Sequence, residues 1–408
     1  MPLSVTSVHP YFAISAVLLV VGWAISRKSL FYLRLLDAEV ASERFHPIDG
    51  LRGFLALGVF FHHAVVSYFF YTQGHWDLPP SQFYTLLGQV GVALFFMITA
   101  FLFWNKGLQA RQFLNAPRMF WSRLCRLAPM YLFSVACVFA VAIVVTDFEV
   151  RQTIKTLALE SLKWISFGFA TPDELNGLSQ SWIINGGVQW TLKYEWLFYL
   201  FLPFGVIFVR GVGFLLLATV SAVFMAGFAT NPWLWNFLFG AFAAVLAAEY
   251  HLLPARIWNT VPVALLVIGV FALVFAMFDG AYGLPQAALL FCAFICIANG
   301  NDLFGILTCR AARMLGALSY SIYLMHAIVL FVALRIVNRF VPISTVSPMN
   351  YWTIIAACGV ILVLICSITY RLVEHPFMKV PMPRWLGGNR SGEPPAAETV
   401  DACLRKAD

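Results

Sequence analysis

The chain has 408 residues, of which 61% are hydrophobic and 11% are charged, and its mean hydropathy is +0.82. This composition excludes an ordinary soluble domain and predicts an all-α polytopic membrane protein. The formal net charge of +7 is explained by basic connections between apolar segments, so no nucleic-acid partner is expected.

Apolar stretches long enough to cross about 30 Å of hydrocarbon recur along the whole sequence. We predict eleven membrane-spanning helices, at residues 11–26, 51–71, 84–104, 127–146, 190–209, 212–230, 233–248, 260–278, 283–299, 314–337 and 351–370. Strict alternation then gathers most Arg and Lys side chains of the connections on one side. The positive-inside rule makes that side cytoplasmic.

The first span, residues 11–26, is followed by basic residues and not preceded by them, which is the reverse of a secretory signal peptide. It is therefore expected to be an uncleaved span that starts outside, with a helix lying in the membrane interface as the alternative. The eight cysteines fall in spans or on the cytoplasmic side, where disulfides are not expected.

Two connections are long. Residues 105–126 carry five basic side chains and are expected to form an amphipathic surface helix through Phe120, Trp121 and Leu124. The outer connection, residues 147–189, is expected to hold a helix near 154–169 and then a polar loop.

Arg52 and His63 lie eleven residues apart in an otherwise apolar helix. Eleven residues overshoot three helical turns by only about 20°, so both side chains leave one face, about 16 Å apart along the axis. Ionisable groups inside a bilayer are costly unless they face a cavity or the interior of a helix bundle, so the pair predicts a functional site. Asp49 is a plausible N-cap that can reach Arg52. The alternative is that Arg52 extends to the headgroups and His63 is a structural core histidine.

Arg123 and Arg126 are three residues apart, so both guanidinium groups lie on one helix face suited to phosphate. Simple anchoring at the cytoplasmic surface explains them equally well. Glu195 follows Trp190 by about 7 Å of helical rise, at a depth that His63 could share. A carboxylate beside an imidazole would orient it and raise its basicity, and a salt bridge that stabilises the bundle is the alternative.

The run from Leu315 to His326 combines small residues that permit close helix packing with a histidine in the middle of a span. From chemistry alone, His326 is more typical of a structural hydrogen-bonding residue than of a catalytic one. Glu374, just beyond the last span, is expected to pair with a cytoplasmic arginine.

Together these segments resemble the acyltransferase 3 family of integral-membrane acyltransferases. The matching segments are Ile48 to Arg52 with His63, Gly91 to Ile98, Arg123 and Arg126 ahead of Pro129, Trp190 to Tyr199 ending in Pro203, Leu315 to His326, and Tyr370 to Phe377. They occur in family order. The sequence departs from the family pattern at Ala93, Thr99 with Ala100, Lys193 and His375.

The resemblance implies a ten-helix core, so the first span is an extra N-terminal transmembrane helix. The expected organisation is that helix and a cytoplasmic linker at 1–45, the acyltransferase 3 transmembrane domain at 46–380, and a disordered cytoplasmic tail at 381–408. The resemblance also implies a multi-pass protein of the bacterial inner membrane. It would transfer an acyl group, usually acetyl from cytoplasmic acetyl-CoA, to a hydroxyl of a glycan or lipid-linked saccharide outside the membrane.

On this hypothesis the CoA nucleotide binds Arg123, Arg126 and Arg118, and the pantetheine arm passes Arg52 towards His63. His63, oriented by Glu195, is either the general base or the carrier of the acyl group. Trp190, Tyr320 and His326 are expected to line the substrate cavity, Asp49 to support Arg52, and no metal is expected. The rival hypothesis is a glycan or lipid transporter that uses Arg52, His63 and Glu195 as a relay, although the sequence lacks the internal repeats typical of many transporters.

Overall fold

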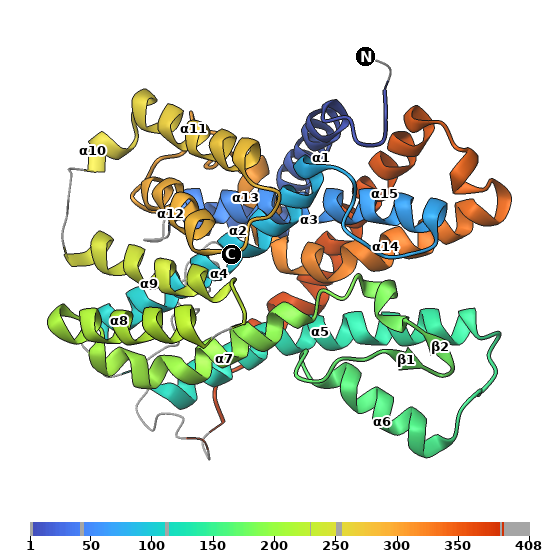
Figure 1. The fold of residues 1–408 in the computed structure, drawn as a ribbon, viewed down its shortest axis with the longest axis horizontal. Helices are drawn as coiled ribbons and strands as arrows, with labels where there is room; N and C mark the ends of the chain where they lie inside the picture. Colours follow the sequence, from blue (N-terminus) through green and yellow to red (C-terminus); the bar gives the residue numbers. More distant parts are fainter. Residues whose placement is uncertain are drawn as a thin grey trace.

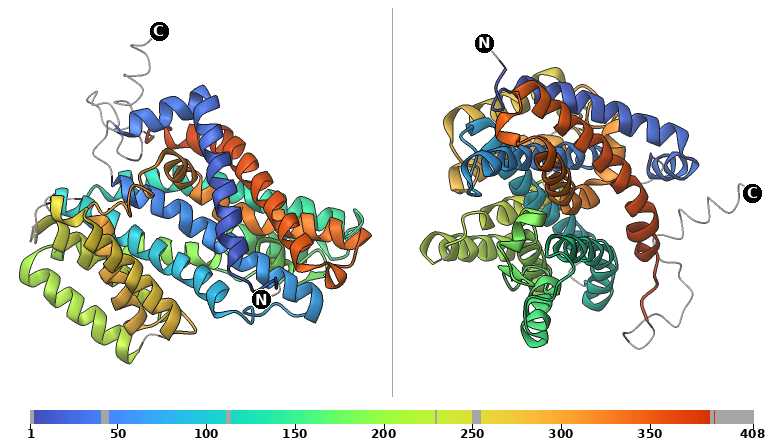
Figure 2. Two further views of the ribbon diagram at one scale, coloured as in Figure 1. Left: turned by 90° about the horizontal axis from the view of Figure 1, so that it is seen from above. Right: turned by 90° about the vertical axis from the view of Figure 1, so that its right-hand side faces the viewer.

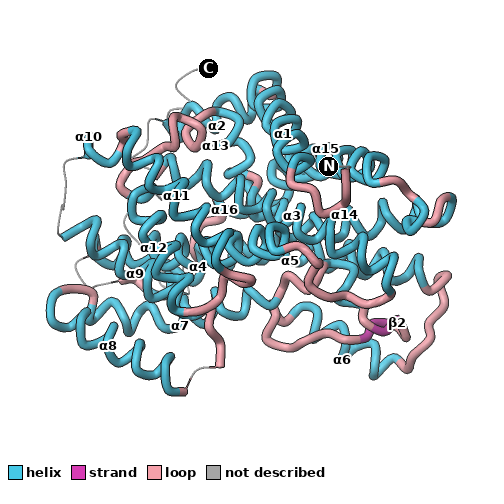
Figure 3. The backbone as a smooth tube through the Cα atoms, turned by 45° about the horizontal axis from the view of Figure 1, so that its top comes forward, coloured by secondary structure: helices cyan, strands magenta, loops and turns pink. Residues whose placement is uncertain are grey.

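The computed structural model describes residues 3–40, 45–110, 114–228, 230–249, 255–383 and 386. Figures 1 and 3 show that most of the described chain is helical. Within these residues, six helical stretches are long and apolar enough to cross a membrane: α1 (His9–Lys28), α3 (His46–Gln73), α4 (Gln82–Gln109), α5 (Ala116–Val145), α14 (Ser319–Phe340), and the stretch formed by α15 (Pro348–Thr369), the π-helical turn η4 (Tyr370–Glu374) and α16 (His375–Met378).

Shorter helices fill the rest of the bundle. They are α7 (Trp190–Gly205), α8 (Gly211–Gly227), α9 (Leu234–Glu249), α11 (Val261–Met277) and α12 (Leu284–Ala298), with the minor helices α2 (Leu30–Val40), α6 (Ile154–Ile165), α10 (Ala255–Trp258) and α13 (Arg310–Ala317). Each predicted span coincides with a helix, and the tenth covers α13 and α14, which meet at Leu318. The predicted all-α polytopic membrane fold is confirmed, and the number of crossings stays a prediction.

α3 begins earlier than the sequence suggested. Its N-cap position is Phe45, Pro47 lies in its first turn, and Asp49 lies inside the helix. The prediction of Asp49 as the N-cap was therefore wrong, because Pro47 fits the first turn of a helix and extends it backwards. The helix ends at Gly74, whose φ of 86° is the left-handed conformation that glycine adopts without strain.

α5 corrects a second expectation. Residues 116–126 do not form a separate surface helix, because α5 runs without interruption from Ala116 to Val145 and includes Phe120, Trp121 and Leu124. The Asn115 side chain accepts a hydrogen bond from the Arg118 backbone N–H at 3.0 Å and so starts the helix. Pro129 lies within α5, as neighbouring helices in a membrane bundle allow.

The long outer connection contains the predicted helix, α6, followed by a small hairpin of β1 (Glu174–Leu175) and β2 (Leu178–Ser179) and the 3₁₀ turn η1 (Ser181–Asn185). Two further 3₁₀ turns, η2 (Val206–Phe208) and η3 (Ile343–Thr345), lie elsewhere. α6 packs on α5, where the Tyr131 hydroxyl donates to the Trp164 carbonyl oxygen at 2.5 Å. These elements lie at the end of the molecule reached by the C-terminal ends of α3, α5 and α14, at the right of Figure 1.

The extra N-terminal segment packs along the outside of the bundle, with α1 against α13 and α15 (Figure 2). Part of the predicted linker forms α2, which is held by Arg310 paired to Asp37 at 2.8 Å and by Arg313 donating to the Leu36 carbonyl oxygen at 2.6 Å. The predicted tail lies outside the described residues except for 381–383 and 386.

Glycines bring α3 against α13 and the loop before it. A β-carbon at Gly50 would lie 1.8 Å from the Leu307 carbonyl oxygen, and one at Gly316 would lie 1.9 Å from the Asp49 carbonyl oxygen. A β-carbon at Gly53 would lie 2.8 Å from the Gly316 nitrogen. Backbone therefore packs directly on backbone here, which is why the small residues predicted at this contact are needed.

We predict that Gly50→Ala lowers the free energy of unfolding by about 1–3 kcal/mol, because the added methyl group overpacks the contact. Gly269→Ala in α11 is the matched control, since nothing lies within 4 Å of the position. Alanine favours a helix over glycine, so the control should melt at or above the wild-type temperature. Thermal melting in detergent measures both, and equal melting of the two variants would contradict the close contact.

Candidate active site

A cavity of about 350 Å³ lies among α3, α4, α5, α7 and α14. Its described lining includes four cationic side chains, Arg52, Lys106, Arg123 and Arg126, and two carboxylates, Asp49 and Glu195. Phe45, Lys106 and Gln109 bound it near helix ends that the predicted topology places in the cytoplasm. The excess of positive charge favours an anionic ligand.

The two arginines of α5 are held by different neighbours. The Arg123 guanidinium lies over the Phe103 ring, 4.8 Å from its centroid. Arg126 lies 3.8 Å from the Glu374 carboxylate, which is fully buried and accepts a hydrogen bond of 2.9 Å from the Ser321 hydroxyl. The predicted pairing of Glu374 with an arginine is confirmed. Both arginines line the cavity.

Arg118 does not join them. Its side chain is exposed in the first turn of α5, and it is absent from the described lining of the cavity. It precedes Arg123 by five residues, which turns it about 140° away around the helix. Ala93 and Lys193, two of the departures from the family pattern, are likewise absent from that lining, and Lys193 lies over the Tyr194 ring at 5.7 Å.

Glu195 belongs to the arginine end of the site. It lines the cavity with Arg123 and Arg126 and accepts a hydrogen bond from the Tyr199 hydroxyl one turn later. We expected Glu195 to orient His63, and the structure instead gives that position to His326. The reason is lateral placement, because α7 packs on α4 whereas His63 faces α14.

His63 and His326 form a histidine pair between α3 and α14. His326 Nε2 lies 3.0 Å from His63 Nδ1, and the ring centroids are 4.9 Å apart. His326 Nδ1 is 3.2 Å from the Ile322 carbonyl oxygen, and His63 Nδ1 is also 3.1 Å from that of Val59. By contrast, His62 contacts the Tyr84 carbonyl oxygen on α4 at 2.9 Å.

These contacts select the tautomers of both rings. A carbonyl oxygen can only accept, so His326 Nδ1 carries a proton for Ile322 and its Nε2 is an acceptor. His63 Nδ1 faces two acceptors and must carry its own proton. The Nε2 atom of His63 is therefore the ring nitrogen without a proton. Gly186 lies beside it, and because a β-carbon at that position would be 3.2 Å from Nε2, the glycine lets the backbone approach this edge of the ring closely.

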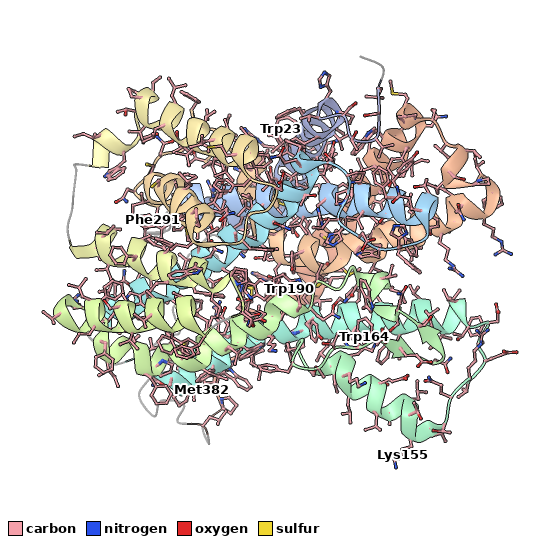
Figure 4. The ribbon with its side chains drawn as sticks, in the orientation of Figure 1. Trp23, Lys155, Trp164, Trp190, Phe291 and Met382 are labelled. Carbon is pink, nitrogen blue, oxygen red and sulfur yellow. The ribbon has the colours of Figure 1, made fainter. Side chains whose placement is uncertain are left out.

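Only one of the three residues expected to line the cavity does so. Tyr320 lines it and donates a hydrogen bond to the Leu127 carbonyl oxygen at 2.8 Å. Trp190 and His326 are absent from the described lining. Trp190 lies near the centre of the molecule (Figure 4), where its ring packs 5.1 Å from that of Trp233, and His326 is fully buried behind the cavity.

The cavity and the histidine pair meet at Tyr323. Its hydroxyl lies 2.9 Å from that of Thr191, and both residues line the cavity. The Tyr323 ring lies 6.1 Å from that of His326. Within their segments, no sequence pattern singled out Tyr199, Ser321 or Tyr323. The histidine pair did have a signal, because a glycine precedes each histidine by ten residues, at Gly53 and Gly316.

A family model described as an acyltransferase domain, Acyl_transf_3, matches residues 45–371. The chain therefore belongs to the acyltransferase 3 family and is a membrane acyltransferase. The match begins after α1 and α2, so these helices precede the family domain. Neither the search of curated proteins nor that of solved structures gave a match.

We predict that Glu374→Gln lowers the free energy of unfolding by about 3–5 kcal/mol, because it removes the counter-charge of a buried guanidinium. Glutamine can still accept from Ser321, so the effect isolates the charge. The control is Asp37→Asn, whose exposed pair with Arg310 should contribute about 1 kcal/mol or less. Thermal melting decides the outcome, and a Glu374→Gln variant that melts like wild type would exclude the ion pair.

Proposed function

We propose that the protein transfers an acyl group, most simply acetyl, from cytoplasmic acyl-CoA to a hydroxyl of a cell-surface or exported polysaccharide such as O-antigen or exopolysaccharide, in the bacterial inner membrane. The observation that carries the proposal is the cationic cavity, whose inner end at Tyr323 adjoins the His63–His326 pair. Membership of an acyltransferase family supplies the class of reaction.

The cavity suits the phosphate-bearing part of acyl-CoA. Arginine is the residue best shaped for bidentate phosphate binding, and three arginines and a lysine line this cavity. Among the described residues, Arg123 Nε and Ser319 Oγ are buried there without a hydrogen-bond partner. Buried polar atoms left without partners need an explanation, and a bound ligand satisfies them. The pantetheine arm would then extend past Thr191 and Tyr323.

His63 is positioned to act as the general base. Its Nε2 accepts the proton of the acceptor hydroxyl as the oxygen attacks the thioester carbonyl carbon. The tetrahedral intermediate collapses by breaking the carbon–sulfur bond, and the leaving thiolate takes the same proton back from His63 Nε2. His326 holds the required tautomer throughout, which is the usual task of the group behind a catalytic histidine.

The same nitrogen would also carry the acyl group in a covalent route. Pre-steady-state measurement of CoA release from acetyl-CoA in the absence of acceptor separates the two routes, because only the covalent one breaks the thioester and releases one CoA as each His63 is acylated. The base mechanism predicts no such burst without acceptor.

We predict that Arg123→Ala with Arg126→Ala weakens acetyl-CoA binding by about 10- to 100-fold for each charge-assisted hydrogen bond lost. Arg118→Ala, on the same helix but outside the described cavity lining, should bind like wild type. Arg34→Ala, an exposed arginine of α2, controls for net charge. Calorimetry on purified protein in detergent measures the affinities for acetyl-CoA. Equal losses of affinity in all variants would mean that Arg123 and Arg126 serve only to set the membrane topology.

We predict that His63→Ala lowers acyl transfer by about 10²- to 10⁴-fold, the usual contribution of a general base. Purified protein with labelled acetyl-CoA and membranes containing the natural acceptor gives the rate. Thioester consumption equal in wild type and His63→Ala would overturn the enzyme proposal and favour a transporter.

His326→Ala tests the tautomer argument separately. Its kcat should fall while the KM for acetyl-CoA stays unchanged, because His326 is remote from the arginines that would hold the donor. An unchanged kcat would mean that His63 does not depend on this partner.

A further inference from the structure

Two tryptophans lie near His63 at the predicted outer side of the membrane, one beside its ring and the other beside the first tryptophan. Trp76 follows the C-terminal end of α3, and its ring centroid is 6.0 Å from that of His63, with the two planes tilted by 31°. Trp182 belongs to η1 in the long outer connection and lies 6.1 Å from Trp76 in an edge-to-face arrangement. Both indoles are half-buried, so each retains an accessible surface.

The cationic cavity does not include this aromatic pair. The arginines gather near the start of α3 and α5, whereas Trp76 and Trp182 lie beyond His63 at the other end of α3. If the donor enters from the arginine end, the acceptor hydroxyl has to reach His63 Nε2 from elsewhere. Gly186, whose backbone lies beside the Nε2 edge of His63, is one residue beyond the end of η1, the turn that contains Trp182.

We propose that Trp76 and Trp182 form the acceptor-binding site and that they stack on a pyranose ring, holding one of its hydroxyls at His63 Nε2. This inference rests on the proposed function and deepens it by assigning residues to the acceptor.

The chemistry of the site favours a saccharide. Indole rings are rigid, largely apolar faces with one polar edge, and the C–H face of a pyranose is apolar while its rim carries hydroxyls. Exposed polar residues flank Trp76 in the chain, namely Gln73 and the pair His75 and Asp77, whose side chains are 3.5 Å apart. Polar side chains of this kind can hydrogen-bond sugar hydroxyls, whereas a pure hydrocarbon acceptor would offer them no hydrogen bonds.

The two tryptophans could instead be interfacial anchors, since tryptophan is enriched at membrane interfaces. The two roles predict different kinetics. An acceptor site changes the KM for acceptor alone, whereas an anchor changes stability or insertion and leaves that KM unchanged.

The experiment uses full-length protein in membranes from the native host with its own gene deleted, so that the membranes supply the natural acceptor. Labelled acetyl-CoA is the probe, and label released from envelope polysaccharide is measured against the amount of membrane added. Trp76→Leu and Trp182→Leu should each raise the apparent KM for acceptor by about 3- to 10-fold, the range of one aromatic stacking contact. The KM for acetyl-CoA should not change.

Two further variants separate stacking from folding. Trp76→Phe keeps an aromatic face and should recover most of the loss seen with leucine. Trp23→Leu in α1, which is 51% exposed and remote from His63 in sequence and fold, should behave as wild type. Thermal melting of every variant identifies any that fail to fold, and Trp76→Phe then remains as the test of the ring.

The outcomes separate the two proposals. Transfer that depends on His63 with an acceptor KM unchanged in the folded Trp76 and Trp182 variants would overturn the acceptor site and leave the acyltransferase intact. Label found only in lipid or protein would also overturn it. Wild-type transfer no greater than that of His63→Ala would overturn the proposed function itself.

Discussion

The glycine contact between α3 and α13 is the constraint on which the site depends. Gly53 meets Gly316 at the start of the two segments, and His63 meets His326 ten residues later along each of them. Because both segments run in the same direction from this contact, it sets their register as well as their distance. A larger residue at the glycines would separate the helices and draw the two imidazoles apart. The backbone contact thus helps to hold the two imidazoles within hydrogen-bond distance from about 15 Å away.

The charged side chains of the cavity lie apart from the His63–His326 pair. The arginines are stabilised at one end of the bundle by Glu374, Glu195 and the Phe103 ring, in contact with the cavity. His63 and His326 lie deeper, where their partners are carbonyl oxygens and each other. Uncharged imidazoles cost much less than ions at that depth, and a neutral imidazole is the form that can accept a proton. The separation therefore serves both stability and chemistry.

The sequence predicted the positions of helices much better than the contacts between them. Apolar runs and proline or glycine boundaries located a helix at every expected span, because these signals are local. The partner of His63 lies far away in the sequence, so the signals that locate a helix do not identify it. Glu195 lies at a depth in the membrane that His63 could share. The depth of a side chain does not show which neighbouring helix it faces, however, and α7 packs on α4. Arg118 shows the same limit within one helix, since its side chain leaves α5 about 140° away from that of Arg123 and five residues earlier.

The outer connection is a structural part of the site and not only a cover. η1 packs against α14, and the chain just after it passes beside His63. Irregular backbone close to a membrane interior is tolerated only where its polar groups have partners. Here Asn185 donates to the Gln189 side chain at 2.8 Å and accepts from the Gly187 N–H at 3.1 Å. These bonds let a non-helical segment reach the level of His63, which a connection confined to the surface could not do. The sequence showed that this connection is long but did not show the reason. Its length allows residues from outside the helices to approach the imidazole of His63.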